Sequence, residues 1–387
     1  QINPGARVAV GVGSRGITNL QTIVAGVLDL LKARGAQPFI VPAMGSHGGA
    51  TPEGQRELLA EYGITEERLQ VPIRPSMEAE RIGVTPDGVE VFFSSEALRA
   101  DGVVVVNRVK PHTDFQSDNL GSGLLKMLVV GLGKRVGAAN YHTWASRFGY
   151  EEIIRASARI TLQAAPILGG VAVVEDQVHA TARLAVVLPA DMESREKQLY
   201  REAKGLMPQL PFDDIDLLIV DCIGKNISGA GMDPNVIGRS LHGYCALLSD
   251  RSTKPAIRRI FVRDLTPETH GNGVGVGLAD FTTSRLVRAI DQRVTFLNAL
   301  TALSLQSVKV PIHFETDREA ITRALESLAL PDSTRARVVR IQDTLSVEKM
   351  EVSEALVEEA RTRADLELLT TSGEMSFDPA DNLAPMK

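Results

Sequence analysis

Hydrophobic and polar positions alternate with two different periods at the start of the chain. The run ARVAVGVG at 6–13 predicts a buried strand, and the segment 17–35 predicts an amphipathic helix. AQPFIVPA at 36–43 then predicts a second strand. A strand, a helix and a strand over this length indicate a βαβ unit, so we expect a parallel sheet.

The same alternation continues through the first half of the chain. Thr51 can cap a helix that Pro52 begins, and the PDG turn between two alternating runs at 81–93 predicts a hairpin. Further expected elements are a buried strand at 102–107, a helix at 150–165, two strands in LGGVAVVEDQ and ARLAVVLP, and a polar-faced helix at 190–207.

A linker divides the chain near its middle. The stretch MPQLPFDD at 207–214 contains two prolines and is followed by the strand-like run IDLLIVD. A second set of α/β elements follows: RRIFVRD and RVVRIQD as strands, with helices near 281–304, 316–329 and 349–362.

We therefore predict two α/β domains with mainly parallel sheets and an active-site cleft between them. The expected boundaries are 1–210 for an N-terminal catalytic domain and 211–370 for a C-terminal domain. The tail at 371–387 is expected to pack back on the first domain or to remain mobile.

Composition narrows the class of protein. The chain has 387 residues, of which 44% are hydrophobic and 23% charged, as is usual for a soluble globular protein. A net charge of −6 without clustering offers no surface for nucleic acid or anionic membrane, and no apolar run approaches the ~20 residues of a membrane span. Cys222 and Cys245 make no disulfide framework. A cytoplasmic enzyme or small-molecule binder is expected.

A glycine-rich loop follows the first predicted strand. Gly11, Gly13 and Gly16 have the spacing of a dinucleotide-binding loop, so an NAD-type oxidoreductase is one hypothesis. Such a site also needs an acidic residue at the end of the second strand, where 41–43 has none. Arg15 lies in the same loop, and it is either a surface residue or a contact for a carboxylate or phosphate.

Three of the seven histidines have distinctive settings. His47 lies between glycines at a strand end, His112 follows a buried strand, and His142 comes after a glycine-punctuated apolar run. Strand ends of a parallel sheet converge, so these imidazoles can supply acid/base groups and a metal ligand. Structural roles for them are the alternative.

Lys126 lies among apolar neighbours in GSGLLKMLVVGLG. A charged group there must find a partner, extend to water or lose its charge. A desolvated amine is a nucleophile or a covalent attachment point, whereas a lysine whose stem packs while its ammonium reaches water is structural. The residues alone leave both readings open.

Taken together, these motifs resemble the nickel-pincer lactate racemase family. The resemblance is carried by GSHGGATPEGQ at 45–55, KPHTDF at 110–115, GSGLLK at 121–126 and a Tyr–His pair sixteen residues after Lys126. It extends into the second half, where DLLIVDCIGKNISGAGMD at 216–233 corresponds to the family's second-domain entry loop.

The resemblance implies a cofactor and a set of roles. Lys126 corresponds to the lysine that holds the nickel-pincer nucleotide covalently, and His142 to the protein ligand of the nickel. His47 and His112 correspond to two acid/base groups on opposite faces of the substrate. The implied activity is that of an isomerase, a racemase or epimerase that inverts the hydroxyl-bearing carbon of an α-hydroxy acid or sugar acid by hydride transfer to the cofactor. Cofactor-biosynthesis enzymes are the implied partners. Lys110 and Lys134 inherit no role.

Departures from the family pattern concern the substrate. Arg15 and Lys225 are retained as expected substrate contacts, but the acid before Arg15 and a lysine beyond Lys225 are missing. The stretch between His112 and Lys126 is longer than expected, and the glycine-rich loop 270–283 either lines the pocket or is a plain turn. Lactate is therefore not the expected substrate. A non-catalytic sugar-acid binder is a further alternative.

Overall fold

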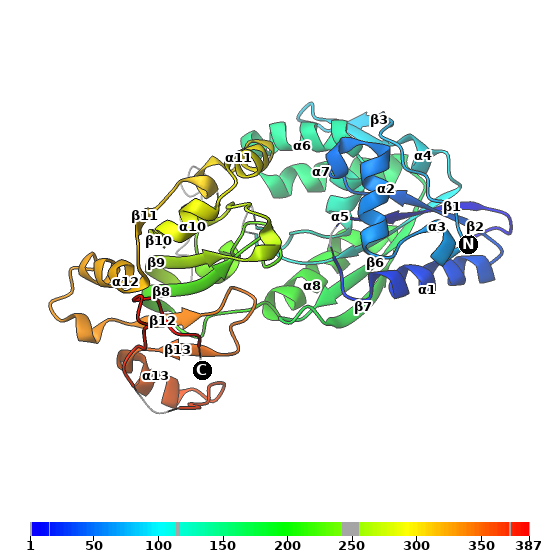
Figure 1. The fold of residues 1–387 in the computed structure, drawn as a ribbon. Helices are drawn as coiled ribbons and strands as arrows, with labels where there is room; N and C mark the ends of the chain where they lie inside the picture. The colour runs from blue at the N-terminus through cyan, green and yellow to red at the C-terminus, as the bar shows by residue number, and fades with distance from the viewer. Residues whose placement is uncertain (1, 15, 114–116, 242–254, 371–372, 387) are drawn as a thin grey trace. The chain divides into compact units, whose positions relative to one another are not determined.

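The computed structural model describes residues 2–14, 16–113, 117–241, 255–370 and 373–386, apart from the side chains of Ser146 and Thr301. The chain forms two compact units, the first running to Met207 and the second beginning at Pro208. Each unit is built around its own sheet (Figure 1). The protein is therefore a mixed α/β protein with two sheet-bearing regions and mainly parallel strands, as the sequence predicts.

The first unit contains a sheet with the strand order β2-β1-β5-β6-β7. The first four strands are parallel and β7 is antiparallel to β6. Their bounds are β1 Arg7–Val12, β2 Gln37–Pro42, β5 Gly102–Arg108, β6 Ile167–Glu175 and β7 Thr181–Val187. The predicted βαβ unit is thus confirmed.

Both faces are covered over the parallel strands β1, β2 and β5, which explains why these strands are almost continuously apolar, whereas the edge strand β7 is largely exposed. Helix α1 (Leu20–Ala33) packs against one face through buried residues at helical spacing, Leu20, Ile23, Val24, Leu28 and Leu31. The other face contacts α5 (Leu124–Lys126), the π-helix η2 (Met127–Gly131) and α8 (Met192–Gly205).

Local signals set the ends of several elements. Thr51 caps α2 (Pro52–Glu61), since its hydroxyl accepts from the Gly54 backbone N–H at 3.1 Å, as predicted. The predicted hairpin is confirmed as β3 (Ala79–Val84) and β4 (Glu90–Ser94). The remaining helices of this unit are α3 Glu66–Leu69, α4 Ser95–Leu98, α6 Lys134–Phe148 and α7 Tyr150–Ala164.

The second unit contains a sheet with the order β11-β10-β9-β8-β12-β13, parallel except for β13. The strands are β8 Asp214–Ile223, β9 Ala256–Leu265, β10 Phe281–Thr283, β11 Ile312–Phe314, β12 Val338–Ile341 and β13 Met350–Val352. Its helices include α9 Pro234–Ile237, α10 Ser284–Ala289, α11 Gln292–Thr301, α12 Asp317–Glu326 and α13 Val357–Thr362.

Two helix predictions in this unit are wrong at their beginnings. The segment expected to be helical from about 349 starts as β13, whose residues pair with β12, and only then becomes α13. The segment expected to be helical from 281 starts as β10, between β9 and β11. Three-residue strands carry too little alternation to predict, because their conformation depends on the neighbouring strands.

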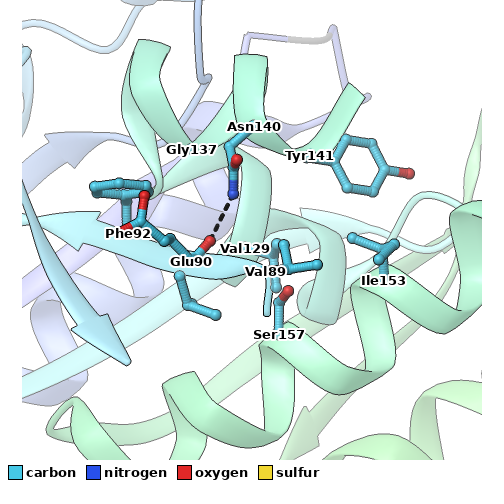
Figure 2. A pocket seen from close by; sticks show the side chains of 10 residues that line it. Val89, Glu90, Phe92, Val129, Gly137, Asn140, Tyr141, Ile153 and Ser157 are labelled. Atoms are coloured by element: carbon cyan, nitrogen blue, oxygen red, sulfur yellow. Dashed lines mark hydrogen bonds between the residues drawn. The ribbon is translucent and has the colours of Figure 1, made fainter. Parts of the chain in front are cut away.

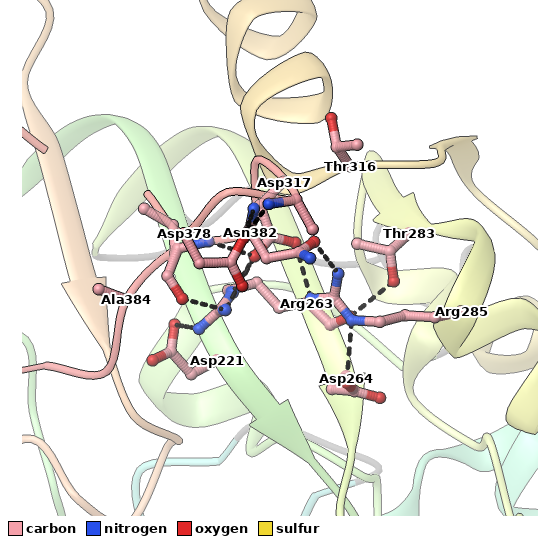
Figure 3. A network of polar contacts seen from close by, with 12 residues as sticks. Asp221, Arg263, Asp264, Thr283, Arg285, Thr316, Asp317, Asp378, Asn382 and Ala384 are labelled. Carbon is pink, nitrogen blue, oxygen red and sulfur yellow. Dashed lines mark hydrogen bonds and ion pairs between the residues drawn. The ribbon is translucent and has the colours of Figure 1, made fainter. Parts of the chain in front are cut away.

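The end of the chain binds to the second unit. Asp317 is fully buried and accepts hydrogen bonds from the Leu383 backbone N–H and from two arginines, Arg263 and Arg285 (Figure 3). Arg340 donates to the Ala384 carbonyl oxygen at 2.7 Å. The described tail residues 376–384 pack on β8, β9 and β12 of this unit. In the parts of the chain that are described, no helix has the length and hydrophobicity to cross a membrane.

Candidate functional site

The carboxyl ends of the parallel strands in the first unit bring the predicted residues to one edge of the sheet. Ser14 follows β1, His47 follows β2, and His112 follows β5. Arg15, the predicted anion contact in the same loop as Ser14, falls outside the described residues.

His47 lies in a tight turn whose backbone carbonyl groups are hydrogen-bonded by a buried side chain. Gly48 has a positive φ of 65°, and a Cβ there would lie 2.6 Å from the Gly54 carbonyl carbon, so only glycine fits. Gln55 is fully buried and donates to the carbonyl oxygens of Gly45 and His47 at 3.0 and 3.3 Å. The His47 ring itself is exposed, and its Nδ1 is hydrogen-bonded to the Ser14 hydroxyl.

His112 and Lys126 are brought together by the closing of the loop between them. The backbone of Lys110 pairs with that of Ser122 through two hydrogen bonds, of 2.8 and 2.9 Å. This pairing folds the chain back on itself, and the Lys126 Nζ and the His112 Nε2 are in hydrogen-bond contact. Both side chains are half-buried, so the amine and the imidazole meet in a partly desolvated place.

His142 lies on α6, which packs against η2, the helical segment that continues from Lys126. The ring of the preceding residue, Tyr141, contacts the His142 ring edge-on, with centroids 5.1 Å apart. Tyr141 also borders a small cavity between β4, α6 and α7, with room for about one water molecule (Figure 2). That cavity is too small for a substrate.

Lys134 connects the helix that carries His142 to the strand that precedes His47. Its side chain is fully buried, and its Nζ donates to the Pro42 carbonyl oxygen, at the end of β2, at 2.6 Å. Burial lowers the pKa of Lys134 from 10.5 to about 8, partly offset by the charge of Glu96. No role was expected for this lysine from sequence.

Backbone contacts join the same two segments. The Gly45 N–H donates to the Gly131 carbonyl oxygen at 3.0 Å. A Cβ at Gly131 would lie 2.5 Å from the Ala43 carbonyl oxygen, so a larger residue would push the segments apart. The turn of His47 and the helical stretch from Lys126 towards His142 are thus packed as one block.

An ion pair fixes the loop between β1 and α1. Arg108, at the end of β5, donates to Glu175, at the end of β6, at 2.6 Å, and Glu175 accepts from the Thr18 backbone N–H at 3.1 Å. Burial alone would raise the pKa of Glu175, but the hydrogen bond from His179 and the charge of Arg108 lower it to about 2. Glu175 is thus held as a carboxylate beside the loop that contains Ser14.

The glycine-rich loop lacks the geometry of a dinucleotide site. Gly11 lies within β1, where a Cβ would meet the Val105 side chain at 3.1 Å, so this glycine serves strand packing. Helix α1 begins only at Leu20, four residues beyond Gly16, rather than directly at the loop. In the described part of this loop, the usual cradle for a pyrophosphate at a helix N-terminus is therefore not formed, which argues against the NAD-type alternative.

Lys225 lies in the second unit, in the turn after β8. It is half-buried, its Nζ donates to the Gly229 carbonyl oxygen at 2.6 Å, and its backbone N–H donates to the Thr269 hydroxyl at 3.1 Å. The loop 270–283 packs on this turn, since a Cβ at Gly231 would lie 1.9 Å from the Val274 carbonyl oxygen. The loop 270–283 and the turn of Lys225 are therefore neighbours.

The described residues do not supply a metal site by themselves. Among them, no group of three or more histidine, cysteine, aspartate or glutamate side chains is gathered so as to hold a metal ion. The first unit instead offers single donors, an amine and imidazoles.

Sequence reasoning missed Ser14, Gln55, Lys134 and Glu175. Three of them act through a partner that is distant in the chain, such as Glu175 on Thr18, 157 residues away, whereas Gln55 contacts a turn 8–10 residues before it. A single sequence contains no signal for such pairs. The signal that could have indicated Lys134 is that it follows an apolar stretch. The same signal drew attention to Lys126.

Comparison with known proteins shows what this chain is similar to. Residues 3–145 match the family model of the lactate racemase N-terminal domain. The fold is similar to that of the lactate racemase apoprotein from Thermoanaerobacterium thermosaccharolyticum, with a TM-score of 0.54 and 16% identity over 89% of this chain and 87% of that chain. A protein from Thermotoga maritima has a TM-score of 0.47 at 13% identity, over 68% and 67% of the chains. None of the curated proteins matches.

Proposed function

We propose that this chain, a homologue of the lactate racemase family, is an isomerase that inverts the hydroxyl-bearing carbon of an α-hydroxy acid or a sugar acid. The observation that carries the proposal is the contact between Lys126 and His112 at the same sheet edge as His47. An amine and two imidazoles at converging strand ends are the groups that this chemistry needs.

The donor set fits the nickel-pincer nucleotide. Lys126 would hold the cofactor through its amine, and His142 would provide the protein's ligand to nickel. Imidazole is a ligand that nickel accepts, and an amine can be linked covalently to a bound group. When bound, this group would supply the acceptor for the hydride of the substrate carbon.

The two histidines would move the proton of the substrate hydroxyl. In His47 the Nδ1 is engaged by Ser14, so we assign proton exchange to its Nε2, which the exposed ring carries. His112 would act from the other face of the substrate. Because imidazole titrates near neutral pH, each histidine can begin as base and finish as acid, so both directions of inversion are served.

We propose that substrate choice depends on residues other than Lys126 and the three histidines. Arg15 and Lys225 would bind the carboxylate, and the long stretch between His112 and Lys126 would shape the pocket. Because the family's acid before Arg15 is missing here, we propose a substrate other than lactate. We further propose that the protein works in the cytoplasm and receives its cofactor from biosynthesis enzymes.

The test is stereochemical. The protein, produced together with the cofactor-building enzymes, is incubated with a panel of single-enantiomer hydroxy acids and sugar acids deuterated at the hydroxyl-bearing carbon. We expect inversion of at least one compound with the deuterium retained, since a hydride returns to the carbon it left. Inversion with loss of the label to water would contradict hydride transfer.

Variants distinguish catalysis from binding. His47→Asn and His112→Asn are each expected to lower kcat by about 10²–10⁴-fold, the usual contribution of an acid/base group. A protein that binds one of the acids equally well with and without Lys126, and inverts none of them, would instead be the non-catalytic binder.

A further inference from the structure

The first turn that carries Lys126 is held by side chains from two other elements. The Leu125 backbone N–H donates to the Glu196 carboxylate at 3.0 Å, and Asn107 donates from its side-chain amide to the Gly123 carbonyl oxygen at 2.8 Å. Glu196 lies on α8, and Asn107 lies on β5. A backbone N–H and a backbone carbonyl group of this turn are therefore both hydrogen-bonded by side chains of other elements.

Glu196 does what a capping residue normally does, but from another helix. The free N–H groups at a helix start are usually satisfied by a serine, threonine or aspartate directly before it. Here that position is Gly123, which has no side chain, whereas Thr51 caps α2 and Thr316 caps α12 in the usual way. The missing local cap is replaced by a carboxylate 71 residues away along the chain.

The burial of Glu196 indicates that this carboxyl group has a particular role. The residue is 1% exposed, and its Oε1 has no hydrogen-bond partner among the described residues. Burying a carboxyl group with so few partners is unfavourable and is seldom retained for stability alone. Burial raises the pKa of Glu196 to about 7, although the hydrogen bonds from Leu125 and Leu124 oppose that rise.

Gly123 leaves room for this contact. A Cβ at residue 123 would lie 2.4 Å from the Glu196 Oε1, so a side chain there would make the carboxyl group move. Glycine therefore leaves the space through which the carboxyl group reaches the turn. A conventional capping residue at 123 would displace the carboxyl group of Glu196 from its present place.

We infer that Glu196 is a positioning residue for Lys126, an assignment that rests on the function proposed above for that lysine. Glu196 fixes the turn at Leu125, one residue before Lys126, and Asn107 fixes it at Gly123. The backbone of Lys126 is thereby anchored to α8 and to β5, and its side chain is aimed at His112. The amine is held where a cofactor would be attached.

The experiment compares Glu196→Leu with Glu196→Gln, using Glu202→Leu as a control on the same helix. Glu202 pairs with Arg183 at the surface, so its loss tests the helix but not the turn. Protein is made without the cofactor pathway, and two quantities are measured: hydrogen exchange of the Leu125 amide, and the rate at which Lys126 is labelled by an amine reagent relative to the other lysines.

We expect Glu196→Leu to speed Leu125 exchange at least tenfold and to change Lys126 labelling at least threefold. Glu196→Gln, which keeps an acceptor oxygen, is expected to stay within about twofold of wild type, as is Glu202→Leu. If Glu196→Leu does not fold, Gly123→Ala displaces the carboxyl group instead and is expected to give the same two changes.

A folded Glu196→Leu or Gly123→Ala protein in which both quantities match the control would overturn the inference. Neither measurement requires activity or cofactor. The positioning role can therefore hold while inversion is never observed, and inversion can be observed while the positioning role fails.

Discussion

Among the described contacts at the sheet edge, those of His47 include two neutral side chains. The Ser14 hydroxyl engages the Nδ1 of His47, and Gln55 holds the backbone beneath the same ring. Both of these contacts come from groups that carry no charge. A hydroxyl that fixes one ring nitrogen also selects the tautomer of the neutral ring.

Removing the Ser14 hydroxyl tests this orientation. In Ser14→Ala we expect kcat to fall about 3–10-fold, because one neutral hydrogen bond contributes ~0.5–1.5 kcal/mol. The ¹⁵N spectrum of His47 is expected to show a changed tautomer population in the same variant. Ser46→Ala is the control, since Ser46 is exposed and adjacent to His47. Equal kcat values and equal spectra in the two variants would contradict the orienting role.

At this scale the sequence indicated the residues that follow predicted strands. His47 and His112 were predicted to lie at strand ends, and the structure places them there. Ser14, Gln55 and Glu196 could not be predicted, because what distinguishes them is a partner in space. Their roles depend on the path of loops, which local periodicity does not determine.

At the scale of elements, buried polar contacts tie helices to strand ends. Lys134 joins the first turn of α6 to the last residue of β2, and Arg108 with Glu175 joins β5 and β6 to the loop before α1. These contacts set where one element stands relative to the next. We expect their energies to depend on pH, since each contains a titrating group.

Lys134→Met tests the contact between α6 and β2. The native protein holds the Lys134 proton less tightly than the unfolded chain does, so wild-type stability rises with pH between about 8 and 10.5. The full lowering of that pKa corresponds to about 3 kcal/mol. The variant lacks this titration. Compared with wild type, the variant is therefore expected to be more stable at pH 7 than it is at pH 10. The difference between the two comparisons is up to ~3 kcal/mol in the free energy of unfolding.

Urea unfolding at the two pH values measures this difference. Lys32→Met is the matched control, because the exposed Lys32 also donates to a backbone carbonyl oxygen, that of Leu69, at 3.3 Å. If Lys134→Met changed the free energy of unfolding equally at both pH values, burial of the Lys134 ammonium would not destabilise the native protein as proposed.

Long periodic elements were predictable and short or irregular ones were not. The strand of 6–13 and the helix of 150–165 appear as β1 and α7, because their patterns extend over whole elements. The strand β13 and the π-helix η2 have three and five residues. A glycine-punctuated run such as 127–131 suits several helical forms, and packing against α6 selects among them.

At the scale of the whole molecule, the tail completes the second unit. Leu383 is buried in a cluster with Phe261 and Phe281, and Phe377 lies beneath Arg318, whose guanidinium carbon is 4.0 Å from the ring centroid. Asp317 connects this segment to two arginines (Figure 3). The two-unit α/β class followed from alternating elements, but the place of the tail did not, because it lacks a periodic pattern.

Asp317→Asn is expected to destabilise the second unit by about 1.5–3 kcal/mol, since it weakens charged hydrogen bonds of a buried carboxylate while Arg263 keeps Asp221 and Arg285 keeps Asp264. Urea unfolding followed by a probe in the second unit would measure this. Glu315→Gln, in an exposed pair with Arg288, is expected to cost less than about 1 kcal/mol. Comparable effects in the two variants would show that the tail network does not support the unit.

The most direct test of the proposed function is the mass and nickel content of the protein made together with the cofactor-building enzymes. We predict an adduct on the intact chain and about one nickel per chain, both lost in Lys126→Arg, since arginine keeps the charge but cannot form the linkage. Lys110→Arg, at a half-buried lysine in the same loop region, is expected to keep both. An unmodified wild-type mass with no bound nickel would contradict the account.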